Sequence, residues 1–165
     1  GLNDMNVNEI TSNFFYRGSS VEKCYIDNTV VSLGGDTHVD MELDVLSTDI
    51  QHDPDCLQKS GRLLLIVKGS IRSPSNELIK VNFELQVEGE FASPEDISDQ
   101  QFTNMLWVSG TSALYGIARG KMEAISSLVF HQGKISFPLI NVIEFLQEKS
   151  KNLKKKIDEQ EPSKE

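Results

Sequence analysis

Residue types that mark several protein classes are scarce in this sequence. Its 165 residues include two cysteines, Cys24 and Cys56, without a CxxC spacing. A disulfide framework is therefore excluded, and the reducing cytoplasm is the expected compartment. No apolar run approaches the roughly 20 residues that a membrane helix needs. The first residues are polar and lack the apolar core of a signal peptide. We therefore expect a cytoplasmic protein that does not insert into membranes.

Positive charge is scarce over most of the chain. The formal net charge is −9, and residues 148–165 carry six lysines against five acids, so the preceding part carries −10. Such an acidic body repels phosphate backbones and anionic membranes, which argues against nucleic acid as a partner. Basic or unfolded protein partners are compatible with this charge.

The first half of the chain carries the patterns of β-strands. Aromatic and β-branched side chains around Gly18 predict one long or broken strand, and later segments alternate apolar and polar residues. Turns are expected at residues 34–36 and 73–76, and a polar loop at residues 48–60. The expected strands cover residues 9–27, 39–45, 63–71 and 79–88. Strands followed by helices are typical of an α+β fold.

Two helices are expected after the strands. Residues 102–130 place apolar side chains at spacings of three and four, and Gly133 favours a helix end just beyond them. Gly116 and Gly120 each cost roughly 1 kcal/mol relative to Ala inside a helix. They indicate either close approach of another element or a local kink. A shorter helix is expected at residues 139–157. We divide the chain into a disordered N-terminus (1–8), one domain (9–147) and a charged helical extension or tail (148–165).

No motif of catalysis or cofactor binding stands out. Residues 52–56 (HDPDC) crowd one loop, but structural zinc needs four nitrogen or sulfur ligands at recurrent spacing, so no metal is expected. Residues 109–112 and His131 lack the G-x-S-x-G context of a nucleophilic serine, and no Lys-Ser/Thr pair follows Gly116 as a phosphate loop requires. We therefore expect neither an enzyme nor a bound cofactor.

Three segments resemble one known family. Residues 85–91 (LQVEGEF) resemble the end of its fourth strand, and residues 114–119 (LYGIAR) resemble its long-helix motif Leu-Phe-Pro-Tyr-Ala-Arg. Residues 137–141 (FPLIN) resemble its run into the last helix. The family is that of SecB, the cytoplasmic export chaperone of bacteria, and its SecB-like relatives. Gly116 and Gly120 replace a proline and an acid of the family, so the chain is similar to its distant members.

The resemblance implies a SecB-like α+β fold, in which a four-stranded antiparallel sheet precedes a long helix and a shorter C-terminal helix. It also implies a homo-oligomeric dimer of dimers that acts as an ATP-independent holdase. Its clients would be unfolded polypeptides, destined for export through the Sec translocase or consisting of one dedicated client such as an antitoxin. The alternative is a SecB-fold adaptor or structural oligomer without general chaperone activity.

The resemblance and the residue types together indicate site residues. The acid through which the family contacts SecA on the fourth strand matches Glu84, and Glu22 and Asp27 are candidates for the acids on the first strand. Gly116 and Gly120 are candidates for helix packing between subunits. Adaptable or aromatic side chains suit client contacts, with core packing as the alternative for each. These candidates are Met41, Met105, Trp107 and Tyr115.

Overall fold

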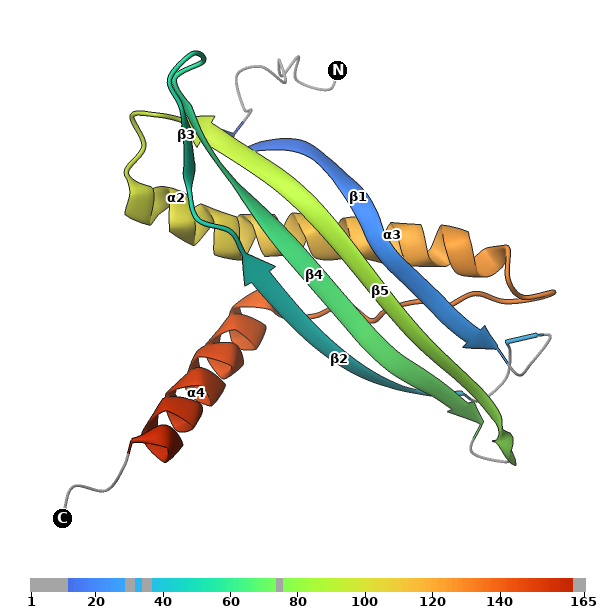
Figure 1. Ribbon diagram of the computed structural model, residues 1–165. Helices are drawn as coiled ribbons and strands as arrows, with labels where there is room; N and C mark the ends of the chain where they lie inside the picture. Colours follow the sequence, from blue (N-terminus) through green and yellow to red (C-terminus); the bar gives the residue numbers. More distant parts are fainter. Residues whose placement is uncertain (1–11, 29–31, 34–36, 74–75, 162–165) are drawn as a thin grey trace, which may run out of the picture.

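The protein is a twisted antiparallel sheet with one long helix on one face and a second helix at one edge (Figure 1). The computed structural model describes residues 12–28, 32–33, 37–73 and 76–161. The strand order is β1-β5-β4-β2, and the short β3 pairs with the start of β4. The strands are β1 (Phe15–Asn28), β2 (His38–Ser47), β3 (Gln51–Asp53), β4 (Gln58–Ser73) and β5 (Asn76–Pro94). The predicted α+β class with four long strands is confirmed.

Strands β2, β4 and β5 extend further than the sequence patterns predicted, whereas β1 begins at Phe15, later than the predicted start at residue 9. The expected polar loop at residues 48–60 is wrong in two parts, which are strands instead. They are β3 and the first residues of β4, and they pair with each other. Polar side chains line both strands there, so no apolar alternation marks them. Gly18 lies beside a bulge in β1 and has a φ of +136°, which explains a glycine inside the strand. The expected turn at 34–36 and the expected N-terminal disorder at 1–8 lie outside the described residues.

Alternation divides the sheet into a covered face and an open face. On β5, Val81, Phe83, Leu85 and Val87 are buried, while the polar residues between them are partly exposed. Direct neighbours in an antiparallel pair point to the same side. Val45 and Leu65 are therefore paired on the covered face, and Asp44 and Ile66 on the open face. The predicted strand periodicity is confirmed.

One long helix covers the buried face. It consists of α2 (Asp99–Met105), a π-helical segment η1 (Leu106–Gly110) and α3 (Thr111–Ser127). Ser98 caps its start by accepting a hydrogen bond of 3.1 Å from the backbone N–H of Gln101. The helix lies close to the sheet at Gly89, where an added Cβ atom would lie 2.8 Å from Leu114 Cδ1.

The ends of this helix differ from the prediction of 102–130. The helix begins earlier, at Asp99, and ends at Ser127, so Gly133 is not the residue that terminates it. Gly133 has another role: its φ is +89°, and a Cβ atom there would lie 2.1 Å from the carbonyl oxygen of Leu33. Gln132 forms a parallel bridge with Ser32 at this point. Only glycine permits this close backbone crossing.

The C-terminal helix α4 (Val142–Gln160) stands beside the edge of the sheet and points away from it (Figure 1). It starts three residues after the predicted Leu139, because the Asn141 side chain caps it by accepting from the Glu144 N–H at 3.0 Å. It continues past Gln147 without a break, and none of its residues is buried. No helix in the described part of the chain has the length and apolar character to cross a membrane.

Candidate functional site

A groove of about 740 Å³ lies between α4 and the open face of the sheet at β2 and β4. This volume lies within the range of small-molecule pockets, roughly 300–1,000 Å³. Leu46 and Ile66 line it from the open face of the sheet, and Phe145 and Leu153 line it from α4. Leu46 is 48% exposed and Leu153 is 53% exposed. Large apolar side chains left open to solvent in one concave place are typical of a binding surface.

The two walls of the groove are joined by an ion pair. The Lys149 ammonium contacts the Asp44 carboxylate, and Asp44 also accepts a hydrogen bond of 2.8 Å from the Val45 N–H. At the other side of α4 a second hollow of about 380 Å³ lies between Val108 of η1 and Ile143 and Leu146 of α4. Helix α4 therefore stands between two grooves, attached to the sheet edge by Lys149 and to η1 by its first turns.

The predicted partner-binding acids lie on the β1–β5 pair. Glu84 points to the open face and is already paired, with Lys68 at 3.2 Å and with Lys23. The hydrogen bond from Lys23 lowers the pKa of Glu84 below its ordinary value, and Lys68 acts in the same direction. The side chain of Glu84 is only 12% exposed, so a basic partner would have to replace two lysines.

Glu22 and Asp27 are exposed residues of β1. Asp27 lies opposite Asn82, diagonal to Glu84 across the same strand pair. Glu22 sits at a register shift, without a partner on β5, and accepts a hydrogen bond of 2.6 Å from Ser20 Oγ. The structure thus places Asp27 near Glu84 and leaves Glu22 apart, and the role of all three acids stays a prediction.

The predicted client-contact residues differ in their burial. Met41 lies on the covered face of β2 and, like Trp107 of η1, packs against the core while partly exposed. Met105 is partly exposed at the end of α2. Tyr115 is buried, its hydroxyl donates to the carbonyl oxygen of Pro138, and burial raises the pKa of the phenol. Their role in client binding stays a prediction, because the groove beside α4 is lined by other residues.

Gly116 and Gly120 lie on the exposed side of α3. A Cβ atom added at either glycine would meet nothing within 4 Å. Packing inside one subunit therefore does not require these glycines. Their proposed role in contacts between subunits is compatible with this exposure and stays a prediction.

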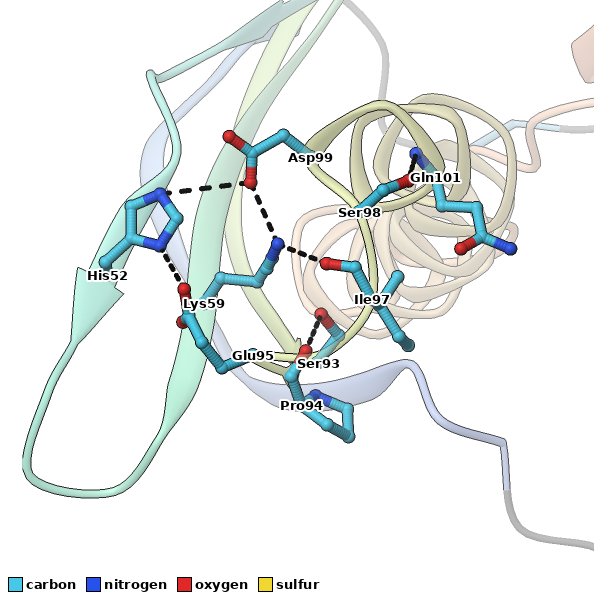
Figure 2. Close-up of polar contacts among 9 residues, drawn as sticks. All are labelled: His52, Lys59, Ser93, Pro94, Glu95, Ile97, Ser98, Asp99 and Gln101. Carbon is cyan, nitrogen blue, oxygen red and sulfur yellow. Dashed lines mark hydrogen bonds and ion pairs between the residues drawn. The ribbon is translucent and has the colours of Figure 1, made fainter.

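A polar cluster ties the β3–β4 hairpin to the start of the long helix (Figure 2). The buried Lys59 ammonium donates to the Asp99 carboxylate at 2.8 Å and to the carbonyl oxygen of Ile97. His52 Nδ1 lies 2.6 Å from Glu95 Oε1, and its Nε2 lies 3.9 Å from Asp99. The hydrogen bond from Lys59 lowers the pKa of Asp99. This cluster fixes the N-terminus of α2, where a carboxylate also complements the helix dipole.

The neighbouring acidic residues form no ion-binding set. Asp53 accepts a hydrogen bond of 2.9 Å from the Asp55 N–H, and a hydrogen bond from the Cys56 thiol lowers the pKa of Asp53. Within the described ranges, no three His, Cys, Asp or Glu side chains form a group that could hold a metal.

The groove residues were not singled out from the sequence, although one signal for them exists. Leu46 follows the buried Val45 and therefore places an apolar side chain on the otherwise acidic face of β2. In β4, residues 63–67 are all apolar, so Leu64 and Ile66 must point to the open face. An unbroken apolar run in an antiparallel strand indicates that both faces need cover.

The arrangement of this sheet and its helices defines a SecB-like α+β fold, as the sequence predicted. No family model matches the chain, and no curated protein matches it. Among solved structures, it is similar to the SecB-like chaperone Rv1957 of Mycobacterium tuberculosis in complex with a ChAD peptide from the HigA1 antitoxin. The TM-score is 0.55 at 11% identity, over 78% of this chain and 91% of that chain. A protein of unknown function from Streptococcus agalactiae matches with a TM-score of 0.36 at 8% identity, over 76% of this chain and 97% of that one.

Proposed function

We propose that this protein is an ATP-independent holdase or adaptor that binds unfolded polypeptide segments in the groove between α4 and β2. The observation that supports this most strongly is the groove itself, in which Leu46, Ile66, Phe145 and Leu153 present apolar surface around an open hollow. Weak apolar contacts along a non-native chain add up to useful affinity without a nucleotide cycle. The similar fold of a chaperone that binds a peptide adds support.

Within this proposal, a dedicated client is favoured over general export. The solved neighbour holds a peptide from an antitoxin. A SecA-like contact through Glu84 would have to break two ion pairs first. Export through the Sec translocase, with SecA as partner, remains the second form of the proposal. An adaptor or structural oligomer without general chaperone activity is the alternative, and the exposed Gly116 and Gly120 suit its subunit contacts.

The remaining parts of the proposal concern assembly, compartment and chemistry. We propose a homo-oligomer, arranged as a dimer of dimers, that works in the cytoplasm and catalyses no reaction. Cys24 and Cys56 are both free thiols, which suits a reducing compartment. His52, the histidine with two carboxylate neighbours, belongs to the polar cluster that fixes the start of α2.

The test is light scattering of a denatured client diluted into buffer with one equivalent of the protein and no nucleotide. We expect aggregation to be suppressed and the pure protein to have the mass of four subunits. The double variant Leu46→Ser/Leu153→Ser should lose suppression while keeping its fold, since both side chains are exposed. The matched control is Leu57→Asn, which removes an exposed leucine of 69% exposure outside the groove, at a φ of +51° that asparagine tolerates. Unchanged aggregation with the wild-type protein would contradict the holdase and leave the adaptor.

A further inference from the structure

Helix α4 carries a heptad pattern that one subunit leaves largely uncovered. Apolar or small side chains recur in it at alternating spacings of three and four, which are the a and d positions of a coiled coil. We call these five residues the α4 seam: Ile143, Leu146, Ser150, Leu153 and Ile157. Ile143, Leu153 and Ile157 are 57%, 53% and 58% exposed. The described part of the subunit therefore covers little of the seam.

The second hollow lies on the same side of α4 as the seam. Three seam residues, Ile143, Leu146 and Ser150, line this space of about 380 Å³, with Val108 of η1 across from them. From there the seam continues along α4, which points away from the sheet (Figure 1). The 14 residue steps from the first to the last seam residue correspond to roughly 21 Å, or about four turns. This length suffices for contact with another helix.

Lysines border the exposed half of the seam on both sides. With 3.6 residues per turn, Lys154 and Lys156 lie roughly 80° to either side of the line between Leu153 and Ile157. Both lysines are exposed, and neither has an ion pair among the residues that the structure describes. They occupy the e and g positions, whose charges determine which helix can pair with a heptad seam. The seam therefore favours a partner with acidic residues at these positions.

A second copy of α4 does not suit the seam. In a parallel pair, Lys149 would lie opposite Lys154 of the other helix, because a g residue faces the e residue five positions later. In the antiparallel register that aligns the two seams, Lys149 would lie opposite Lys156. Both arrangements place like charges beside each other, which is destabilising. The charges of α4 thus disfavour pairing with itself.

An extended anionic surface suits the seam less well than a single helix does. A membrane or a nucleic acid would reach past α4 to the body of the protein, where residues 1–147 carry a net charge of −10. A helix that lies along α4 keeps its charges near the lysines, and charges beyond about 8 Å are largely screened at physiological salt. The charge distribution therefore favours a narrow acidic partner.

We propose that the α4 seam binds one amphipathic helix of a partner protein, which has apolar residues at its a and d positions and acidic residues at e and g. The partner helix fills the hollow beside Val108 and continues over Leu153 and Ile157. This inference goes beyond the client groove and does not depend on it. Leu153 is the only seam residue that also lines that groove.

The test uses two labelled, capped peptides of three heptads and the full chain. Both peptides carry isoleucine at a and leucine at d, and they differ only in having glutamate or lysine at e and g. The wild-type protein should bind the acidic peptide at least about tenfold more tightly than the basic one. Ile157→Ser should weaken binding of the acidic peptide about tenfold, since it removes apolar contact at an exposed seam position.

Two charge reversals give the sharpest comparison. Lys154→Glu at the border of the seam should lower the preference for the acidic peptide about tenfold, whereas Lys155→Glu on the far side of the helix should change it less than about twofold. The two variants are matched, because each places a carboxylate four residues before an acid, Asp158 or Glu159. Their effects on the helix itself should therefore be equal.

Several outcomes would overturn the inference. Equal loss of preference in both reversals would show diffuse attraction in place of a paired helix. Binding to phosphatidylserine vesicles without binding to either peptide would assign α4 to a membrane surface. A lower mass of the pure Ile157→Ser protein would assign the seam to a second copy. Suppression of client aggregation should be unchanged in Lys154→Glu, so failure of the holdase and failure of the helix site give different results.

Discussion

The two long helices that follow the sheet are held in different ways. Helix α3 buries Leu114, Tyr115, Ala118 and Met122 against the strands, whereas α4 buries none of its residues. Leu153 and Ile157 of α4 are more than half exposed, at 53% and 58%. The position of α3 thus follows from the core, while that of α4 depends on a cap, its first turns and one ion pair. Phe145, in the first turns of α4, packs against the core, whereas Leu153 and Ile157 do little for the stability of one subunit.

The largest expected effect is a difference in stability between variants of the buried helix α3 and of the exposed helix α4. Leu114→Ala removes a fully buried side chain and should lower the free energy of unfolding by about 2–5 kcal/mol. Leu153→Ala should change it by no more than about 0.5 kcal/mol, because the side chain is exposed. Urea unfolding of both variants measures this difference. A similar loss in Leu153→Ala would show that α4 is part of the folded core.

The next effect concerns the start of the long helix. Lys59→Met removes the buried ammonium that donates to the Ile97 carbonyl oxygen and to Asp99. It should destabilise the protein by about 1–3 kcal/mol, because the Ile97 carbonyl oxygen loses its partner. Lys155→Met on the exposed side of α4 is the control and should be nearly neutral. Thermal unfolding measures the stability of both variants. Equal stabilities would contradict a stabilising role of the Lys59 contacts with Ile97 and Asp99.

The same contact predicts a dependence on pH. The Lys59 hydrogen bond lowers the pKa of Asp99 in the folded state. A depressed carboxyl pKa stabilises the fold above the unfolded value of about 3.9, and this contribution is lost as the pH falls through the folded pKa. We therefore expect acid unfolding below about pH 4 to be shallower in Lys59→Met than in the wild-type protein. Identical acid transitions of the two proteins would show that the contact between Lys59 and Asp99 does not stabilise the fold.

A smaller effect on stability is expected at the exposed side of α3, where Gly120 lies. Gly120→Ala should stabilise a single subunit by up to about 1 kcal/mol, because its Cβ atom meets nothing and helix propensity improves. Gly120→Leu should instead weaken assembly if this side packs against another subunit, and Lys121→Leu is a control on the neighbouring position. Sedimentation reads the assembly directly. Unchanged mass in Gly120→Leu would remove the glycines from the subunit contact.

The smallest expected effect is at the attachment of α4. Lys149→Ala removes an ion pair at the protein surface, so stability should change by less than about 1 kcal/mol. Amide exchange within α4 should nevertheless become faster, because this pair links the helix to β2. Unchanged exchange in α4 would mean that its first turns against η1 are sufficient to hold it.

The strand and helix patterns predicted most of the fold, because each buried face repeats with the period of its element. The alternation over 79–88 and the apolar spacing in 102–130 place the core correctly. The β3–β4 hairpin was missed because its residues are polar and Lys59 is buried only through its partners on α2. The π segment at 106–110 leaves no mark in residue type.

The candidate groove was harder to predict from the sequence. It arises between Leu46 of β2 and Leu153 of α4, which are far apart in the chain, and helical periodicity does not say where α4 stands. Residues chosen for their chemistry, such as Tyr115, lie in the core instead, since an aromatic ring serves packing as readily as binding. Leu46 was the one residue that could have indicated the groove, because it is apolar and lies on an acidic face of its strand.

The most direct test of the binding groove is photo-crosslinking of an unfolded client. A photoreactive amino acid is placed at Leu46, at Leu153 or, as control, at Leu57, and a denatured client is added in one equivalent without nucleotide. The account predicts crosslinks from the first two positions and little from the third. Equal crosslinking from all three, or crosslinking only from Leu57, would contradict a client site between β2 and α4.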